Sequence, residues 1–441
     1  MSPGPDPEEG SRQKPASARI AAVDLNGILR GKRIPRAKLE NPARMPLSAL
    51  NVDIFGHDIE DSPLVFESGD ADGALRPADR PRVPLPWLAD APPLALCEMY
   101  EDKETPFDGD PRQALARVIA QFSARGWRPR CAVEIEFYLV EAEGALAAPR
   151  VPRTQRRAKS PQVLGLQHLD GFEAFFNDIE TGAASMGLAP ATITSESGLG
   201  QFEITLDHAE AMKAADDALF MKELIRGTAQ NHGLTATFLA KPFPDEPGSG
   251  LHVHASLMDE EGRNLFDDGG PRGTPLLRQA VAGILRAMPA STLIFAPHLA
   301  SFARFVDHAH APTGASWGYD NRTVALRIPS GPPPARRFEH RVAGADANPY
   351  LLFAAILGAA FSGLAASQEP PEPLAGNAYG QACPSLCPDM AAAIDALRDP
   401  VMLKFFAPRL LDNLARTKAQ ELRKCAALSQ SDLTQALLEV V

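Results

Sequence analysis

The chain has 441 residues and a net charge of −11, and its 45% hydrophobic and 22% charged residues are typical of an ordinary globular protein. This acidity argues against a nucleic-acid partner, for which a basic patch would be expected. No apolar run is long enough for a membrane span, and the N-terminus lacks the pattern of a secretory signal, so we expect neither a membrane association nor export.

The N-terminal part of the chain predicts a small sheet domain. Residues 1–17 are rich in Pro, Gly, Glu and Ser and predict a disordered tail. Two strand-like runs then flank Asn26-Gly27, a dipeptide that between such runs predicts a hairpin. Short strands rich in Pro, Gly and Asp follow, so we expect the N-terminal domain to cover residues 18–107.

A larger domain is expected over residues 108–441. Asp110 before Pro111 predicts a helix start, with Asp110 as the N-cap and Pro111 as the first helical residue. Beyond Arg130, strands that carry polar motifs are expected to alternate with helices, and the tail after Ser385 is helical and amphipathic. Helices are predicted over residues 114–123, 172–186, 209–231, 274–288 and 349–365, and loops over 142–161 and 242–250.

The cysteines are few for the length and irregularly spaced. The five are Cys97, Cys131, Cys383, Cys387 and Cys425. Cys383 and Cys387 suggest a metal pair, but no second pair or nearby histidine completes a zinc site. Reduced thiols in a cytoplasmic protein are therefore the prediction.

Glu134 and Glu136 alternate with apolar residues in the sequence Val-Glu-Ile-Glu-Phe. In a strand this spacing puts both carboxylates on one face and the apolar side chains on the other. One interpretation is a half-exposed strand with solvated carboxylates. Because like charges on one face repel unless a cation lies between them, a bound divalent metal is the other interpretation.

His252 and His254 repeat the same spacing directly after a Gly-Ser-Gly sequence. A single histidine in a strand is more often a hydrogen-bonded residue than a ligand, whereas two on one face are harder to explain in this way. The glycines would let the backbone approach a ligand closely. We interpret one imidazole as a metal ligand and the other as a contact to a phosphate or carboxylate.

Further carboxylates and arginines follow the same pattern. Glu196 and Glu203 flank a glycine-containing turn, and Glu339 lies within a group of arginines. The arginines of this group are Arg327, Arg336, Arg337 and Arg341. They could form surface ion pairs of little energetic value, but arginines near a metal also neutralise a transferring phosphoryl group. No glycine-rich phosphate loop or dinucleotide fingerprint is present.

The order of these motifs resembles that of the glutamine synthetase family. Glu-x-Glu precedes Glu-(x)6-Glu, and Gly-Ser-Gly-Leu-His-Val-His, Asn-Arg and Arg-x-Glu-x-Arg follow. The resemblance extends over residues 18–430. It implies an α+β fold, in which an N-terminal β-grasp-like domain precedes a catalytic domain with a curved antiparallel sheet and flanking helices.

The resemblance also implies the chemistry. In that family, ATP phosphorylates the side-chain carboxylate of glutamate and an amine then displaces the phosphate, at a site organised by divalent cations. Two to three Mg²⁺ or Mn²⁺ ions per site are expected, which suits carboxylate oxygens with an imidazole. The ligands implied for the metal nearer glutamate are Glu136, Glu196 and Glu203. Those implied for the metal nearer ATP are Glu134, His252 and Glu339.

Positions for the substrates are implied in the same way. Arg304 and Arg341 would hold the glutamate carboxylate, with Gly248 at its amino-acid end. Arg322 resembles the residue that stabilises the transferring phosphoryl group. The nucleotide-side positions are His254, Ser256, Arg327 and Arg337.

The chain departs from the family pattern at three places. Pro247 replaces an Asn that contacts glutamate, and His310 replaces the flap Glu. The N-terminal segment lacks the Phe-Asp-Gly-Ser-Ser pattern whose Asp helps to bind ammonium, and residues 54–58 are its nearest equivalent. Loss of both negative charges should weaken ammonium binding and leave room for an alkyl amine. Residues 66–70 and 317–322 are similar to the γ-glutamylpolyamine synthetase branch.

We therefore predict an ATP-dependent ligase that joins glutamate to a primary amine, either a polyamine or a small monoamine, through γ-glutamyl phosphate. His310 is either a base that deprotonates the amine or a flap residue without a catalytic role. The alternatives are a glutamine synthetase that uses ammonia and a non-catalytic relative that acts as a sensor or assembly partner. The family further implies a dodecamer of two hexameric rings.

Overall fold

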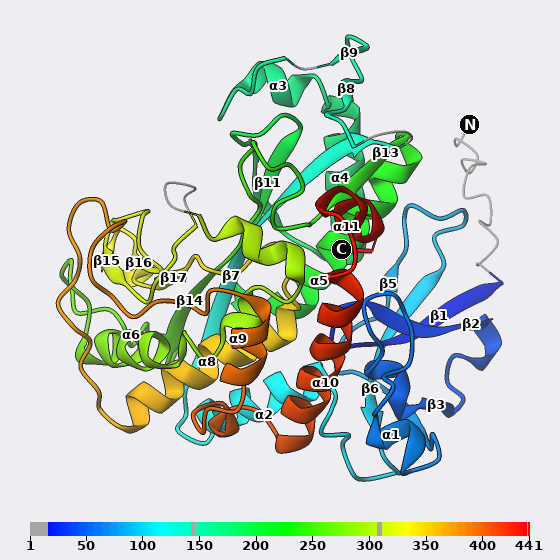
Figure 1. The fold of residues 1–441 in the computed structure, drawn as a ribbon, viewed down its shortest axis with the longest axis horizontal. Helices are drawn as coiled ribbons and strands as arrows, with labels where there is room; N and C mark the ends of the chain where they lie inside the picture. Colours follow the sequence, from blue (N-terminus) through cyan, green and yellow to red (C-terminus); the bar gives the residue numbers. More distant parts are fainter. Residues whose placement is uncertain (1–15, 143–145, 158, 307–310, 439) are drawn as a thin grey trace, which may run out of the picture.

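The computed structural model of the protein describes residues 16–142, 146–157, 159–306, 311–438 and 440–441. These residues form an N-terminal sheet of six strands, a central sheet of nine strands and a two-stranded ribbon. Figure 1 shows the N-terminal sheet beside the C-terminal helix α10 (Pro408–Cys425), while the central sheet and its helices form the larger part of the molecule.

The N-terminal sheet has the strand order β2-β1-β6-β4-β3, with β5 paired to β6. Its strands are β1 (Ser17–Val23), β2 (Leu29–Pro35), β3 (Ala43–Pro46), β4 (Asp72–Pro77), β5 (Val83–Pro84) and β6 (Pro93–Tyr100). The hairpin predicted at Asn26-Gly27 is confirmed, because β1 and β2 are antiparallel neighbours and Gly27 has a φ of 79°. The predicted tail is wrong at its end, since Ser17 begins β1 and pairs with Pro35. Residues 1–15 of that tail lie outside the described residues.

The central sheet has the order β10-β11-β7-β14-β17-β16-β15, and β12 and β13 also pair with β7. Its strands are β7 (Arg128–Glu141), β10 (Pro190–Ser195), β11 (Gln201–Leu206), β12 (Ala209–Glu210), β13 (Leu234–Thr237), β14 (Leu251–Met258), β15 (Trp317–Tyr319), β16 (Leu326–Ile328) and β17 (Phe338–His340). Every pairing is antiparallel except that of β15 with β16.

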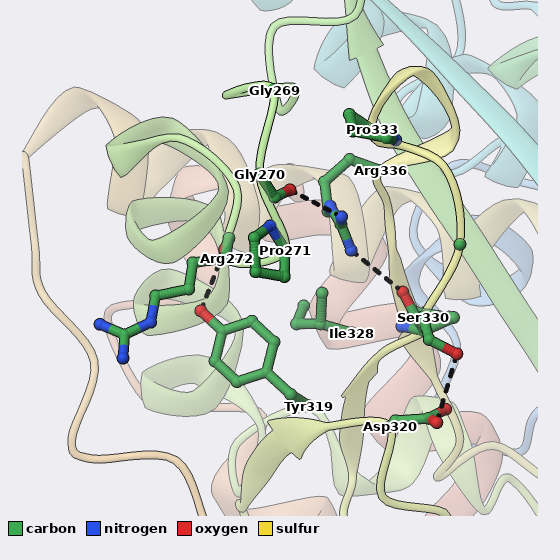
Figure 2. A pocket seen from close by; sticks show the side chains of 12 residues that line it. Gly269, Gly270, Pro271, Arg272, Tyr319, Asp320, Ile328, Ser330, Pro333 and Arg336 are labelled. Atoms are coloured by element: carbon green, nitrogen blue, oxygen red, sulfur yellow. Dashed lines mark hydrogen bonds between the residues drawn. The ribbon is translucent and has the colours of Figure 1, made fainter.

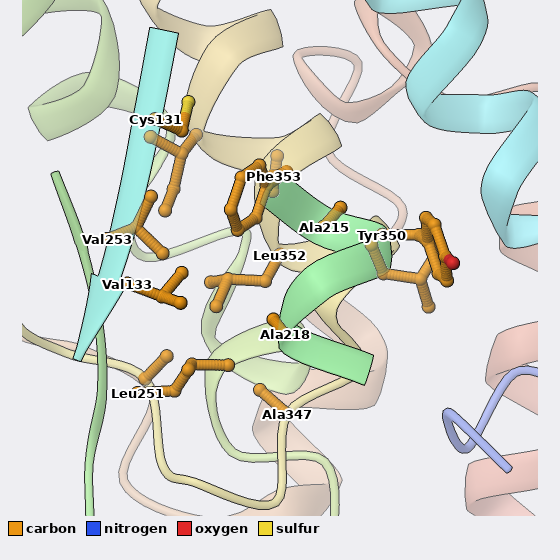
Figure 3. Packing of buried hydrophobic residues seen from close by; sticks show 14 of the residues in the cluster. Cys131, Val133, Ala215, Ala218, Leu251, Val253, Ala347, Tyr350, Leu352 and Phe353 are labelled. Atoms are coloured by element: carbon orange, nitrogen blue, oxygen red, sulfur yellow. The ribbon is translucent and has the colours of Figure 1, made fainter. Parts of the chain in front are cut away.

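One face of β7 is apolar and the other is polar, as the alternation predicts. Val133, Ile135 and Phe137 are fully buried, whereas Glu134 and Glu136 on the opposite face are half-buried. Figure 3 shows the apolar side chains of β7 and β14 packed against those of the helices α5 (Ala211–Asn231) and α8 (Pro349–Ala365). The core thus supports the sheet from one side and leaves the other side free for the polar motifs.

The predicted helices are present. They correspond to α2 (Pro111–Ser123), α4 (Glu173–Met186), α5, α6 (Pro275–Ala287) and α8. Besides these and α10, the structure contains the helices α1 (Pro63–Phe66), α3 (Leu166–Asp170), α7 (Thr292–Phe295), α9 (Met390–Ala396) and α11 (Gln430–Leu437). Short 3-10 helices are η1 (Arg36–Lys38), η2 (Leu47–Leu50), η3 (Leu299–Arg304), η4 (Pro333–Ala335) and η5 (Met402–Lys404). The predicted cap of α2 is confirmed, because the Asp110 carboxylate accepts hydrogen bonds from the backbone of Arg112 and Gln113.

Two details differ from the predictions or leave them open. The loop expected over 142–161 contains the ribbon strands β8 (Arg150–Val151) and β9 (Arg156–Arg157). The domain boundary near residue 107 stays a prediction, because strands of the N-terminal sheet share a hydrophobic cluster with the central sheet. The fold class itself is confirmed by the antiparallel central sheet and its flanking helices. None of the described helices is long and apolar enough to cross a membrane.

Candidate active site

The register of the central sheet gathers the polar motifs on one face. Directly opposed on neighbouring strands are Glu203 and Glu136, Glu134 and His252, His254 and Glu339, and Arg327 and Glu339. Directly opposed residues in a sheet have neighbouring side chains on the same face. Segments far apart in the sequence therefore form a single row of acids, imidazoles and guanidinium groups across five strands.

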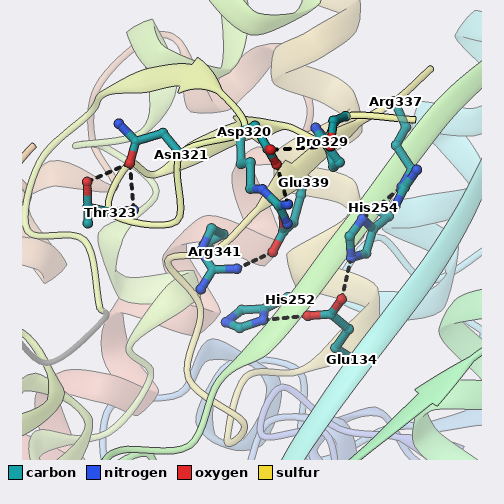
Figure 4. A network of polar contacts seen from close by, with 12 residues as sticks. Glu134, His252, His254, Asp320, Asn321, Thr323, Pro329, Arg337, Glu339 and Arg341 are labelled. Atoms are coloured by element: carbon teal, nitrogen blue, oxygen red, sulfur yellow. Dashed lines mark hydrogen bonds and ion pairs between the residues drawn. The ribbon is translucent and has the colours of Figure 1, made fainter. Parts of the chain in front are cut away.

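Figure 4 shows that Glu134 is joined to both His252 and His254. Its two carboxylate oxygens lie 2.8 Å from His252 Nδ1 and 2.8 Å from His254 Nε2. Arg337 Nε donates to His254 Nδ1 at 3.1 Å, so His254 carries its proton on Nε2 and donates it to Glu134. Burial would raise the pKa of Glu134, but the hydrogen bonds from the two imidazoles hold that pKa far below its ordinary value.

His252 has a ring nitrogen that is free to bind a metal. Its Nε2 atom is buried and has no hydrogen-bond partner within the described part of the chain. When Nδ1 donates to Glu134, a neutral imidazole keeps its lone pair on Nε2. A metal-binding histidine characteristically donates its other ring nitrogen to a carboxylate in this way.

Two groups of side chains bring three ligand atoms within 4.8 Å of one another. One group is Glu134, Glu203 and His252, and the other is Glu134, His254 and Glu339. These groups differ from the division that the family resemblance implies, so the assignment of each ligand to one ion stays a prediction. Glu136 accepts a hydrogen bond of 2.6 Å from the Gly250 backbone, and Glu196 lies in the turn after β10. The first group, with carboxylate oxygens and one imidazole, fits a divalent cation. In the second group the carboxylates of Glu134 and Glu339 are the donors, because both ring nitrogens of His254 are hydrogen-bonded.

The carboxylates of Glu196 and Glu203 lie close to other acids that repel their negative charge. Burial, together with the charges of Glu134 and Glu136, raises the pKa of Glu203 to about 9. Burial and the charge of Glu136 raise the pKa of Glu196 to about 7. Burial and like charge therefore favour the protonated forms of these two carboxylates. A divalent ion would remove this repulsion, so the electrostatics also fit a metal.

Glu339 is held by arginines on both sides. The Arg341 guanidinium donates to one carboxylate oxygen, and Arg327 Nη1 donates to the other at 3.0 Å. Arg327 also donates to Asp320 at 2.7 Å. Burial opposes the ionisation of Glu339, but Arg341 and His254 keep its pKa below the ordinary value. Glu339 is therefore an anion in the closed interior of the site.

Arg304 crosses directly over the glycines that precede β14. A Cβ atom at Gly248 would lie 2.9 Å from Arg304 Cγ, and one at Gly250 would lie 2.7 Å from Arg304 Nη2 and 2.8 Å from His252 Nε2. Arg304 Nη1 donates to the Val342 carbonyl at 2.6 Å. The glycines therefore allow a buried guanidinium and an imidazole to meet above the backbone.

Sequence reasoning missed the side chains that hold the Gly-Ser-Gly loop. Gln201 Nε2 donates to the carbonyl oxygen of Gly248 at 3.0 Å, and the Tyr138 hydroxyl donates to that of Pro247 at 2.7 Å. Gln201 lies between Glu196 and Glu203 in the sequence, two residues before Glu203, and had been given no role. Although Pro247 lacks an amide side chain, its backbone is fixed beside the site.

The remaining predicted site residues lie at the rim or outside the described residues. Arg322 is exposed and makes no side-chain hydrogen bond or ion pair to another described residue. His310 lies outside the described residues, so its role stays a prediction. A cavity of about 310 Å³ is lined by Glu134, His254, Ser256 and Arg337.

A second cavity, of about 570 Å³, was not indicated by any motif. Figure 2 shows that Tyr319, Asp320, Ser330 and Arg336 lie around it. Asp320 accepts a hydrogen bond of 3.2 Å from Ser330, in addition to the one from Arg327. Arg327 thus connects the wall of this cavity to Glu339.

The model of the family described as "Glutamine synthetase, catalytic domain" matches residues 108–435. The chain belongs to the glutamine synthetase family. Enzymes of this family use ATP and divalent metal ions, which agrees with the donor set on the sheet face.

Individual members of the glutamine synthetase family are similar to this chain over most of their length. The chain is 40% identical to gamma-glutamylputrescine synthetase of Escherichia coli (strain K12), over 82% of this chain and 78% of the relative. It is 31% identical to glutamate–isopropylamine ligase of a Pseudomonas species, over 92% and 91%. A solved structure described as a novel glutamine synthase homolog superposes with a TM-score of 0.84 at 26% identity, over 98% of this chain and all of the other.

For this glutamine synthetase family member, metal binding is expected to strengthen as the pH rises from about 6 to about 9, because a cation must displace the protons on Glu196 and Glu203. Without metal, the raised pKa values should lower stability with rising pH, since the carboxylates of the unfolded chain lose their protons first. The increase in Tm that Mn²⁺ causes should therefore be larger near pH 8.5 than near pH 6. Glu203→Gln should reduce this difference, and equal increases at both pH values would contradict the prediction.

Proposed function

We propose that the protein is an ATP-dependent ligase that forms a γ-glutamylamide from glutamate and a primary amine. One observation carries the proposal: a buried row of carboxylates, imidazoles and arginines on one sheet face, in a chain without the acids that the family uses to bind ammonium. The names of the two relatives describe ligases that act on putrescine and isopropylamine, which supports an alkyl amine as the acceptor.

The arginines serve the two anionic substrates. Arg304 and Arg341 bind the carboxylate of glutamate, and Gly248 lies at its amino-acid end. Arg304 is 4% exposed and Arg341 6% exposed, so a carboxylate between them would be shielded from water and strongly bound. Mutual repulsion between the two cations is removed when the substrate arrives.

The nucleotide occupies the cavity of about 310 Å³, where His254, Ser256 and Arg337 contact ATP. Arg327 and Arg337 hold its phosphates, since guanidinium groups bind phosphate oxygens in pairs. Arg322 at the rim neutralises the phosphoryl group during its transfer. Mg²⁺ or Mn²⁺, when bound by the carboxylates and His252, supplies positive charge that stabilises the phosphate oxygens.

The reaction proceeds in two steps. A γ-carboxylate oxygen of glutamate attacks the terminal phosphorus of ATP, which releases ADP and leaves γ-glutamyl phosphate. The amine nitrogen then attacks the γ-carbonyl carbon, the C–O bond to phosphate breaks, and the nitrogen loses a proton. His310, which stands where the family has its flap Glu, is the proposed acceptor of that proton, because imidazole is a common general base near neutral pH.

The acceptor can be identified by measuring phosphate release with ATP, Mg²⁺, glutamate and a panel of amines. The panel contains putrescine, spermidine, ethanolamine, methylamine, isopropylamine and ammonium. We expect kcat/KM for at least one alkyl amine to exceed that for ammonium by about tenfold or more, the value of one or two buried methylene groups. Mass spectrometry of the product should show the corresponding γ-glutamylamide.

Each alternative predicts a different outcome of this experiment. If ammonium has the highest kcat/KM, the protein is a glutamine synthetase and the proposal fails. If no amine supports Mg²⁺-dependent ATP turnover, the protein is a non-catalytic member of the family. A dodecamer of two hexameric rings and a cytoplasmic location stay predictions, and the mass of the native particle tests the first of them.

A further inference from the structure

The 3-10 helix η3 determines where Arg304 lies. Arg304 is the last residue of η3, and Ser301 stands three positions before it. Side chains three residues apart lie above one another in a 3-10 helix, so Ser301 and Arg304 share one side of η3. Whatever holds Ser301 therefore holds the side of η3 from which Arg304 extends toward Gly250.

A buried carboxylate holds Ser301. The Ser301 hydroxyl donates to Asp346 Oδ2 at 2.6 Å and accepts from the His298 backbone at 3.0 Å. Ser301 is 1% exposed and Asp346 3% exposed. The second oxygen of Asp346 has no hydrogen-bond partner among the described residues. Ser301 is thus the one side chain of the described chain that donates a hydrogen bond to this anion.

Asp346 also lies next to the other half of the glutamate site. The backbone of the preceding residue, Ala345, donates to the Ser249 carbonyl at 3.0 Å and accepts from Lys222 Nζ at 2.8 Å. Ser249 belongs to the Gly-Ser-Gly loop over which Arg304 crosses. Asp346 therefore connects η3 to the loop that faces it across the site.

The charge of Asp346 is matched by cations around it. The positive charges of Arg304 and Lys222 lie close enough to Asp346 for their own pKa values to be affected by it. A buried anion without such partners would be costly. Its negative charge also favours the charged form of the Arg304 guanidinium.

The start of η3 lies beside α10. His298 Nδ1 lies 3.6 Å from Glu421 Oε2 on α10, and Glu421 in turn binds Lys418 at 2.8 Å and the Ile54 backbone at 2.8 Å. Glu421 therefore joins α10 to the N-terminal part directly beside His298, whose Nδ1 atom has no hydrogen-bond partner among the described residues. The later residues of η3 are held by the bond from Ser301 to Asp346 and by the bond from Arg304 Nη1 to the Val342 carbonyl.

We propose that Asp346 is a positioning residue of the glutamate site, which acts on Arg304 through Ser301. The inference rests on the proposed function, in which Arg304 binds the carboxylate of glutamate. Asp346 itself touches neither substrate. Its removal should weaken the binding of glutamate and leave the nucleotide cavity unchanged, because neither Asp346 nor Ser301 nor Arg304 lines that cavity.

The test compares Ser301→Ala, Asp346→Asn and the double variant with the wild-type protein. We expect each single variant to raise KM for glutamate about tenfold to a hundredfold, the effect of a misplacement of about 1 Å, with KM for ATP unchanged. Because both residues act as one unit, the double variant should be no worse than the more severe single variant. Ser291→Ala is the matched control, since Ser291 is equally buried at 1% exposure but does not contact η3.

Calorimetric titration of glutamate, together with thermal unfolding, separates the possible outcomes. If the variants lose stability but bind glutamate as the wild type does, Asp346 is only a structural residue and the inference is wrong. Equal increases in KM for glutamate and ATP would overturn it as well. If the wild-type protein itself does not bind glutamate, the proposed function fails instead. Asp346→Asn keeps an acceptor for Ser301, so it should lose less affinity for glutamate than Asp346→Ala does.

Discussion

Replacing Glu134 by glutamine is expected to lower kcat/KM by about a thousandfold while the protein stays folded. Glu134 supplies an oxygen to both candidate metal groups and accepts hydrogen bonds from both imidazoles. Glutamine is neutral and has one acceptor oxygen, so one imidazole N–H would face an amide N–H instead. If the transition state loses about 4 kcal/mol of electrostatic stabilisation, the rate falls about a thousandfold.

Three measurements check this expectation. Steady-state kinetics give kcat/KM, calorimetry gives the affinity for Mn²⁺, and thermal unfolding reports whether the fold is intact. Glu261→Gln is a suitable control, because the Glu261 side chain is 65% exposed and pairs with Arg263 at the surface. A Glu134→Gln enzyme that keeps the affinity for Mn²⁺ and loses less than about tenfold in kcat/KM would show that Glu134 does not organise the metal site.

Gly250→Ala is expected to raise KM for glutamate and lower kcat, with an overall loss of about a hundredfold in kcat/KM. The new Cβ atom would lie 2.7 Å from Arg304 Nη2 and 2.8 Å from His252 Nε2. Both atoms are at the ends of side chains, which can move aside at little cost to the fold. The groups that move, however, are the proposed glutamate contact and a proposed metal ligand.

Gly270→Ala provides the comparison for this substitution. A Cβ atom at Gly270 would lie 3.5 Å from its nearest neighbour, Asp268 Oδ1, which is an ordinary contact. Activity and stability should therefore remain close to those of the wild type. If Gly250→Ala loses stability without losing affinity for glutamate and Mn²⁺, Gly250 serves the packing of the strand and not the site.

The residues of the site could be predicted because their chemistry follows a local pattern. Glu134, Glu136, His252 and His254 alternate with apolar residues at the spacing of a strand, and that alternation determines which face they share. The motif order then identifies the family. The polar residues of the site, and the face of the strand on which each lies, can therefore be predicted without knowing how the strands pair.

The grouping of ligands could not be predicted in this way. It depends on which residues oppose each other across strands, and Glu134 meets both His252 on β14 and, through His254, Glu339 on β17. Alternation within one strand contains no information about this register. Ser301 and Asp346 were missed for a related reason, because a single buried contact between distant segments has no periodic signature.

His340 shows the same limit on the apolar face of the sheet. It faces the core beside Phe338, with neither ring nitrogen hydrogen-bonded to any described residue, and its ring centroid lies 4.6 Å from that of Phe295. Burial lowers the pKa of His340 to about 3, so it stays neutral. The spacing predicts the face of the strand on which His340 lies. It does not predict that the imidazole packs in the core as an apolar side chain would.

The long sequence separations within the site determine when it can form during folding. Glu134 and His252 are 118 residues apart, and Arg337 is 83 residues from His254. Closing such long loops is entropically costly, so contacts of this kind form after local helices and hairpins. Binding of Mn²⁺ during refolding therefore reports the completed sheet, and a collapsed intermediate with helices but unpaired strands would have no metal site.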